Sequence, residues 1–104
     1  MIKQIIIVFI METFYKPPFK KFTEKQARPL QLSIEDEIER IIENPAMGET
    51  KKGDLKGFRV NKFAFKKQKL LIAYRFSETE ILFYMVGTHE DFYRKLRKYW
   101  KEGD

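Results

Sequence analysis

Residues 55–86 read LKGFRVNKFAFKKQKLLIAYRFSETEILFYMV, and this stretch decides the fold. It contains three apolar runs, residues 58–65, 70–76 and 81–86, separated by polar turns at 66–69 and 77–80. Short runs with apolar side chains at alternate positions are typical of β-strands. Tight turns between them predict an antiparallel meander. The run 70–76 is apolar at consecutive positions, so we expect it to be a central strand, covered on both faces.

The first of the three runs changes phase along its length. Its apolar positions are even up to Val60 and odd from Phe63 onward. Such a slip predicts a bulge or a bend near Asn61. A bulge there would place Arg59 and Lys62 on the same side of the sheet, although their positions have opposite parity.

Two helices are predicted ahead of the strands. Residues 18–26 carry Phe19 and Phe22 on one helical face, and a proline in the first turn is a usual helix opening. Residues 29–43 form the second helix, although Ser33 offers a later start. Its apolar stripe comprises Leu30, Ile34, Ile38, Ile41 and Ile42. The tight turn between the helices predicts an αα-hairpin whose apolar side covers one face of the sheet.

The chain begins with an apolar run, residues 1–10, that has two interpretations. It is either a buried strand or an extension ahead of a natural start at Met11. The run is shorter than the ~20 residues that a membrane-spanning helix needs, so we expect no membrane anchor. Residues 12–15 continue or constitute a first strand. Residues 46–54 contain two glycines and several charges, and we expect them to form a solvated loop.

Residues 87–100 read GTHEDFYRKLRKYW and contain the candidate site. Thr88 and Asp91 have the spacing of a capping box, which predicts that a helix opens at Thr88. Its apolar face comprises Phe92, Leu96, Tyr99 and Trp100. His89, in the first turn, and Tyr93, four residues later, would share one side of this helix. Such a pair is suited to phosphate chemistry, or it is simply a solvated helix edge.

The composition limits the classes of protein that this chain can be. Its 104 residues predict a single domain, 1–104, with 1–10 as a possible extension. The absence of cysteine excludes disulfides and thiolate metal sites, and a single histidine makes a structural zinc site unexpected. The net charge of +6, together with 15% aromatic residues, favours an acidic or nucleic-acid partner.

Several short sequence words occur in a defined order along the chain. They are YKP at 15–17, FKKF at 19–22, IENP at 42–45, GDLKGFRV at 53–60, LLIAYR at 70–75 and VGTHEDFY at 86–93. The ordered set, over about residues 11–101, resembles the RelE/ParE superfamily of bacterial type II toxin–antitoxin toxins. The resemblance implies an α+β fold: a helical hairpin packed on an antiparallel β-sheet meander, with a C-terminal helix and a concave basic face.

The resemblance also implies a function. RelE-like members enter the ribosomal A site and cut mRNA, whereas ParE-like members poison DNA gyrase. An antitoxin silences both kinds. We therefore expect a cytoplasmic, ribosome-dependent mRNA endonuclease that needs no metal or cofactor. The alternative is a gyrase inhibitor without nuclease activity. The expected partners are a cognate antitoxin, in a possible toxin–antitoxin hetero-oligomer, and the ribosome with its mRNA.

Metal-free RNA cleavage needs a base for the 2′-hydroxyl, an acid for the leaving 5′-oxygen, and cations for the transition state. An imidazole can serve as base or acid near neutral pH. The resemblance implies that His89 is catalytic and that Tyr93 stacks on a base or transfers a proton. It also implies that Arg59 and Arg75 bind phosphate. The expected RNA-binding cations are Lys51, Lys52, Lys56 and Lys62.

Each of these assignments has a structural alternative. His89 can simply belong to the helix start, Tyr93 can pack against the sheet, and the loop lysines can be solvated. Arg75 can pair with the acids of the second helix. Several nuclease members of the superfamily place an acid or a second histidine on the meander, where this chain has Asn61 and Gln68. Cleavage would then depend on one good acid–base group, helped by Tyr93 and the cations.

Overall fold

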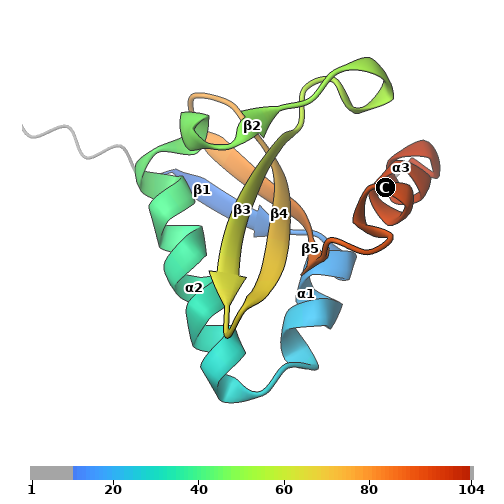
Figure 1. The fold of residues 1–104 in the computed structure, drawn as a ribbon. Coiled ribbons are helices and arrows are strands. Elements are labelled where there is room, and N and C mark those ends of the chain that lie inside the picture. The colour runs from blue at the N-terminus through green and yellow to red at the C-terminus, as the bar shows by residue number, and fades with distance from the viewer. Residues whose placement is uncertain (1–10, 104) are drawn as a thin grey trace, which may run out of the picture.

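The computed structural model describes residues 11–103, and Figure 1 shows its ribbon. The strands are β1 Glu12–Tyr15, β2 Glu49–Thr50, β3 Arg59–Phe65, β4 Gln68–Phe76 and β5 Glu80–Thr88. The helices are α1 Pro17–Glu24, α2 Arg28–Glu43 and α3 Phe92–Lys101, with short 3₁₀ turns at Pro45–Met47 and Gly53–Leu55. The two interpretations of residues 1–10 lie outside the described residues. No helix within 11–103 is long and apolar enough to cross a bilayer.

The strands form one five-stranded sheet in the order β1-β5-β4-β3-β2. β3, β4 and β5 are the predicted antiparallel meander, and β4 lies at the centre, as its two apolar faces indicate. β1 pairs with β5 in parallel, after which the chain leaves the sheet through the two helices. The fold is therefore the predicted α+β arrangement, with a mixed sheet (Figure 1).

The helical hairpin covers one face of the sheet, as predicted. We call its contact with the sheet the hairpin core; its buried residues are Phe19, Leu30, Ile34, Ile41, Leu70, Ile72, Tyr74, Ile81, Phe83 and Val86. The second helix begins at Arg28, with Ala27 as its extended N-cap. The later start at Ser33 is therefore wrong, because Pro29 fits the first turn of a helix, where a backbone N–H has no intrahelical acceptor.

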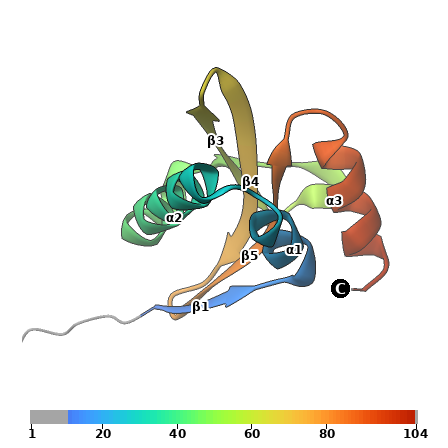
Figure 2. The same ribbon diagram turned by 90° about the horizontal axis from the view of Figure 1, so that it is seen from below.

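The C-terminal helix lies against the opposite face of the sheet, so that the sheet is a middle layer (Figure 2). We call this second cluster the α3 core; its buried residues are Leu55, Phe58, Val60, Leu71, Ala73, Tyr84, Met85, Phe92 and Leu96. The half-buried Trp100 meets the ring of Phe58 edge to face, with 5.1 Å between centroids. The predicted apolar face of the last helix therefore docks that helix onto the sheet.

The bulge predicted near Asn61 is wrong. β3 pairs with β4 without interruption, and its apolar side chains change parity because the strand contributes to both cores. Val60 belongs to the α3 core, whereas Phe63 packs against the hairpin core. Since successive side chains of a regular strand alternate between faces, Arg59 and Lys62 lie on opposite faces of the sheet.

The one irregularity in the described ladders occurs between β4 and β5. Ala73 pairs with Met85 and Tyr74 pairs with Phe83, which leaves Tyr84 as the extra residue. Tyr84 and Met85 consequently both belong to the α3 core. A bulge of this kind increases local twist and redirects side chains.

Two predicted boundaries differ from the structure. Thr88 is not a helix cap, because it is the last residue of β5 and pairs with Leu70. The N-cap is Asp91, which has a left-handed φ of 61° and no side-chain capping hydrogen bond. His89 therefore lies in the connection before α3, where the chain turns sharply off the sheet. The predicted loop 46–54 also contains β2, which adds a short edge strand beside β3.

Candidate functional site

His89 and Tyr93 lie at the junction between β5 and α3. The imidazole of His89 is exposed, and Tyr93 is half-buried. Their rings meet edge to face, with 6.4 Å between centroids and 81° between planes. The two residues therefore share one side, as predicted, although His89 precedes the helix rather than opening it. This places an accessible imidazole beside a phenol that the fold holds in place.

Lys51 approaches the same phenol from the segment between the β2 strand and β3. Its ammonium nitrogen lies 4.9 Å from the centre of the Tyr93 ring and 2.5 Å from a carboxylate oxygen of Glu49. The hydrogen bond that Lys51 donates to Glu49 is the main cause that raises the pKa of Lys51, and Tyr93 contributes in the same direction. Lys51 is therefore a stable cation suited to electrostatic stabilisation, and it is unsuited to act as a base.

Glu49 is a site residue that sequence analysis missed. Its pKa is lowered, first by the hydrogen bond from Lys51 and further by the charges of Lys51 and Lys62. A carboxylate with these neighbours is ionised at neutral pH and can accept a proton or hold Lys51 in place. The signal in the sequence was that Glu49 and Lys51 are two apart, which places both on one side of an extended segment.

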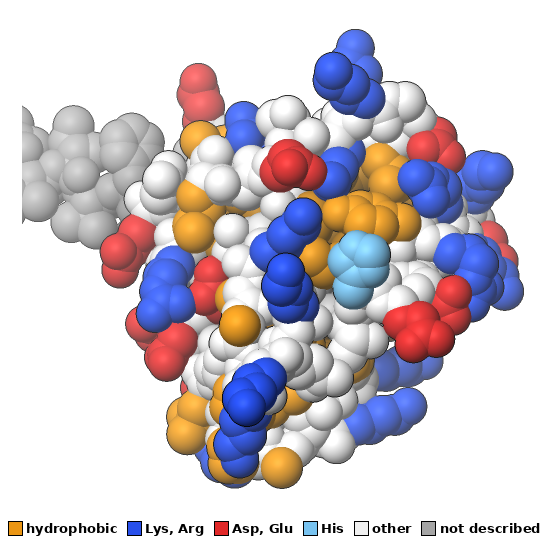
Figure 3. All heavy atoms as spheres, viewed as in Figure 1, with side chains coloured by type: hydrophobic (Ala, Val, Ile, Leu, Met, Phe, Trp, Pro, Cys, Tyr) orange, Lys and Arg blue, Asp and Glu red, His pale blue; other side chains and the backbone are white. Residues whose placement is uncertain are grey.

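Lys62 lies on the β3 face that also carries the α3 core, and its side chain is exposed. Its effect on the Glu49 carboxyl shows that it belongs to the same electrostatic cluster. Figure 3 shows the one histidine of the sequence, in pale blue, among blue Lys and Arg side chains and next to an apolar patch. We call Glu49, Lys51, Lys62, His89 and Tyr93 the junction cluster. Lys52 and Lys56 are exposed in the neighbouring loop.

Arg75 faces the α3 side of the sheet but is held by aromatic rings. Its guanidinium carbon lies 5.0 Å from the centre of the Phe58 ring and 4.8 Å from that of Trp100. Nη1 also donates to the backbone oxygen of Lys56 at 3.3 Å. Gly57, with a φ of 97°, leaves room for this guanidinium, since a Cβ there would lie 2.7 Å from it. Arg75 therefore fastens α3 to the sheet.

The alternative in which Arg75 pairs with acids of α2 is wrong, because α2 lies on the other face of the sheet. The buried acid of α2 is Glu37, which is 4% exposed. Its carboxylate accepts hydrogen bonds from Asn61 at 2.5 Å and from Arg40 at 2.6 Å. Asn61 consequently points away from the junction cluster, and it does not stand in for a missing acid there.

Arg59 does not join His89. Its Nη1 donates to the backbone oxygens of Ala46, at 3.0 Å, and Gly48, at 2.8 Å. Its guanidinium also lies 5.6 Å from the centre of the exposed Phe76 ring. Arg59, which the resemblance implied as a phosphate-binding residue, therefore lies apart from His89, because the uninterrupted register of β3 turns it toward the α2 side.

A family model described as the ParE-like toxin of type II bacterial toxin–antitoxin systems matches residues 13–97. No curated protein matches the sequence. Within residues 11–103, no group of three or more His, Asp or Glu side chains could hold a metal ion.

Three solved structures share the fold. The E. coli RelBE toxin–antitoxin complex matches with a TM-score of 0.62 and 13% identity, over 78% of this chain and 99% of that chain. A doubly substituted E. coli RelE toxin in the free state matches with a TM-score of 0.66 and 11% identity, over 88% of this chain and 96% of that chain. The isolated E. coli RelE toxin matches with a TM-score of 0.61 and 10% identity, over 86% of this chain and 99% of that chain. At such identities the likeness establishes the fold alone.

Proposed function

Since the matching family model spans residues 13–97, this chain belongs to the ParE-like toxins of type II bacterial toxin–antitoxin systems, within the RelE/ParE superfamily, and we propose that it is a metal-independent endoribonuclease that cuts mRNA on the ribosome. The observation that carries the proposal is the junction cluster. It combines an exposed imidazole, a phenol, an ionised carboxylate and two lysines on one side of the sheet.

The reaction assigns a chemical step to each group. The ribose 2′-oxygen attacks the neighbouring phosphorus, the bond from phosphorus to the 5′-oxygen breaks, and a 2′,3′-cyclic phosphate remains. Glu49, as a carboxylate, accepts the proton of the 2′-hydroxyl, and His89 as imidazolium protonates the leaving 5′-oxygen. Tyr93 positions Lys51 and offers a ring edge to the substrate.

Lys51 and Lys62 supply the cations that the transition state needs. The pentavalent phosphorane carries more negative charge on its oxygens than the ground-state phosphodiester, and fixed cations stabilise that increase. Removing one such preorganised group typically costs about 2.7–4 kcal/mol, which is a rate loss of about 10²–10³. Lys52 and Lys56 are placed to contact the RNA backbone, where they contribute to affinity rather than to rate. Arg75 is a positioning residue that acts through α3.

Because His89 is exposed, we expect the RNA strand to be ordered by another molecule before it reaches the site. An open site on a protein of this size orders little of a flexible RNA strand by itself. Correct alignment of the 2′-oxygen with the phosphate contributes several kcal/mol to such a reaction. We infer that the ribosome supplies this alignment by presenting the mRNA, and that isolated mRNA is a poor substrate.

A gyrase inhibitor is the second candidate, and two observations favour it. The matching family model is described as ParE-like, and Arg59 is turned away from His89, which leaves fewer phosphate-binding groups than expected. This candidate requires no chemistry at His89. It predicts that cells expressing the toxin show a DNA damage response while their mRNA stays intact.

Controlled expression distinguishes the two candidates. We expect growth arrest, with new 5′ ends on several mRNAs within minutes of induction, detected by primer extension. His89→Gln should abolish both effects, whereas Lys67→Gln at the exposed β3–β4 hairpin should leave both unchanged. Growth arrest with intact mRNA and an induced DNA damage reporter would instead support gyrase as the target.

A further inference from the structure

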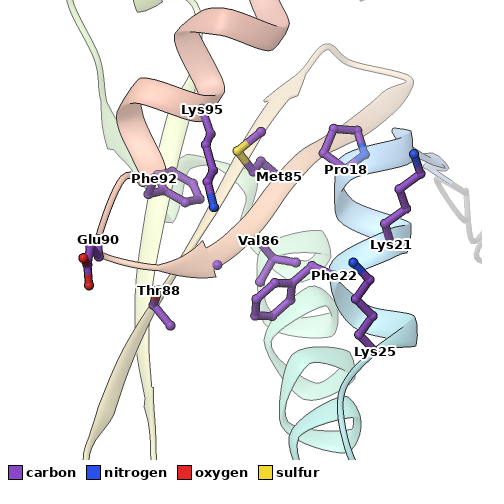
Figure 4. Close-up of a pocket in the computed structure, with 11 residues that line it drawn as sticks. Pro18, Lys21, Phe22, Lys25, Met85, Val86, Thr88, Glu90, Phe92 and Lys95 are labelled. Atoms are coloured by element: carbon purple, nitrogen blue, oxygen red, sulfur yellow. The ribbon is translucent and has the colours of Figure 1, made fainter.

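A concave surface that does not include His89 lies beside the β5–α3 connection. It is a cleft of about 260 Å³ between α1, the end of β5 and the first turn of α3 (Figure 4). Phe22, Val86 and Phe92 form an apolar floor, and Lys21, Lys25 and Lys95 surround it. None of these residues belongs to the junction cluster.

Lys21 and Lys25 interact with no acidic side chain in the described part of the chain, and the charge of Lys95 contributes only in a minor way to the lowered pKa of Asp91. Among residues 11–103, none of the three lysines forms a salt bridge. Lys21 lies in the last turn of α1 and Lys25 is the C-cap of that helix, and Figure 4 shows Lys95 reaching down from α3 opposite them. The acid at the rim, Glu90, lies on the far side of the cleft from α1 (Figure 4). The cleft is therefore a cationic ring around an apolar centre.

We propose that this cleft binds an acidic, amphipathic segment of the antitoxin. One apolar side chain of that segment enters the floor, and carboxylates on either side of it pair with the lysines. The volume fits this occupant, because a cavity of about 150 Å³ already accepts a benzene ring. Charge complementarity selects it, since three ammonium groups without a salt bridge favour a partner with at least two carboxylates.

The same geometry disfavours a nucleotide as the occupant. Base recognition commonly uses an accessible aromatic face for stacking. Phe92 is 2% exposed and offers no such face, and the half-buried Phe22 offers only part of one. The cations are also lysines, which lack the planar fork with which arginine holds phosphate in two places. Carboxylate side chains on a peptide satisfy flexible ammonium groups without that geometry.

The position of the cleft gives docking a direct connection to the site. Gly87 and Thr88 line the cleft, and the next residue is His89. A bound segment would therefore lie against the backbone next to the imidazole, while neither Lys51 nor Lys62 lines the cleft. Neutralisation through this cleft does not require the antitoxin to cover the junction cluster. The inference rests on membership of the toxin family and is independent of the nuclease proposal.

A binding experiment tests the inference without any measurement of activity. The probe is the purified antitoxin encoded beside this toxin, titrated onto the full-length chain by isothermal calorimetry. We expect the double variant Lys21→Glu with Lys25→Glu to bind at least about 100-fold more weakly than the parent. The matched control, Lys66→Glu with Lys67→Glu, has the same charge change on the exposed β3–β4 hairpin and should bind within about 3-fold of the parent.

A crosslinking experiment locates the occupant directly. The chain has no cysteine, so Lys25→Cys introduces a single thiol for a benzophenone label. We expect this label to crosslink the antitoxin, and the same label at Lys66→Cys to give no product. Equal affinities of the two double variants, or crosslinking at Lys66 alone, would overturn the inference. Unchanged antitoxin affinity with weakened ribosome binding of the Lys21/Lys25 variant would also overturn it, and would assign the cleft to RNA.

Discussion

The ammonium nitrogen of Lys51 lies 4.9 Å from the centre of the Tyr93 ring, although one residue follows the β2 edge strand and the other lies in the C-terminal helix. This contact joins Lys51 to the junction that carries His89. The Lys51 side chain would rotate freely in an isolated loop, and the contact with Tyr93 restricts that rotation. The catalytic proposal depends on that cation being in place before the substrate arrives.

Replacing Lys51 tests whether this cation stabilises the transition state. Lys51→Gln should lower the single-turnover rate of mRNA cleavage on ribosomes by about 10²–10³, because one preorganised charge is lost. Affinity for the ribosome should change far less. Lys52→Gln, in the adjacent exposed position, is the matched control and should reduce the rate by less than about 10-fold. Equal effects of the two substitutions would reduce Lys51 to an RNA-backbone contact.

Glu49→Gln should lower the pKa of Lys51, because the hydrogen bond that Lys51 donates to the Glu49 carboxylate is the main cause that raises it. The measurement is an NMR titration of the Lys51 side chain. The Glu49 pKa lies below its usual 4.5 and the Lys51 pKa lies above its usual 10.5. The ion pair is therefore lost only as the pH falls through the lowered value or rises through the raised one. Near neutral pH the ion pair should therefore stay intact in the parent protein.

Tyr74→Phe should destabilise the fold by about 1–3 kcal/mol, measured by urea unfolding. The buried phenol accepts a hydrogen bond from the Gly48 N–H at 2.9 Å and donates to the Pro45 oxygen at 2.6 Å. The substitution leaves both backbone groups without this partner. Tyr15→Phe is the control, because that half-buried ring packs in the hairpin core, and it should change stability by less than about 0.5 kcal/mol.

The same phenol predicts a loss of stability at alkaline pH. Burial raises the pKa of Tyr74 above its usual 10.0. A raised folded-state pKa means that the neutral phenol stabilises the fold below the unfolded value, and that this contribution is lost as the pH rises through the folded one. The parent should therefore lose stability above about pH 10 more steeply than Tyr74→Phe. Parallel stability curves for the two proteins would contradict this assignment.

Arg75→Lys should loosen α3. The planar guanidinium contacts two rings, and an ammonium group cannot stack on both, so a loss of about 1 kcal/mol is expected in thermal unfolding. Trp100, the only tryptophan, reports the change by its fluorescence. Arg97→Lys is the control, because Arg97 is exposed and pairs only with Asp54 among the contacts within 11–103. A larger effect of the control would show that α3 is not held through Arg75.

Much of the fold could be predicted because its signals are local. The apolar run of β4 on both faces indicated its central position, and the spacing of Leu30, Ile34 and Ile41 indicated the buried side of α2. The phase change in β3 was misread because a strand between two cores can change its buried side without any bulge. The real irregularity, at Tyr84, was invisible because the residues on both sides of it are also apolar and buried.

The site was harder to predict than the fold. His89 and Tyr93 lie together because they are close in sequence. The contact of Lys51 with Tyr93 depends on where an irregular segment runs, and no periodic pattern specifies that path. Glu49 was missed for the same reason. Arg59 and Arg75 could be recognised as strand residues, but the face that each one occupies depends on the register of β3 with β4.

The most direct test of the proposed function is cleavage in a purified translation system. Ribosomes stalled on a short 5′-labelled mRNA are mixed with the parent protein or with His89→Gln, and the fragments are resolved on a sequencing gel. The account predicts one main cut that ends in a 2′,3′-cyclic phosphate, a loss of at least about 100-fold in rate for His89→Gln, and no cut without ribosomes. An intact mRNA with the parent protein, or equal cleavage by His89→Gln, would contradict it.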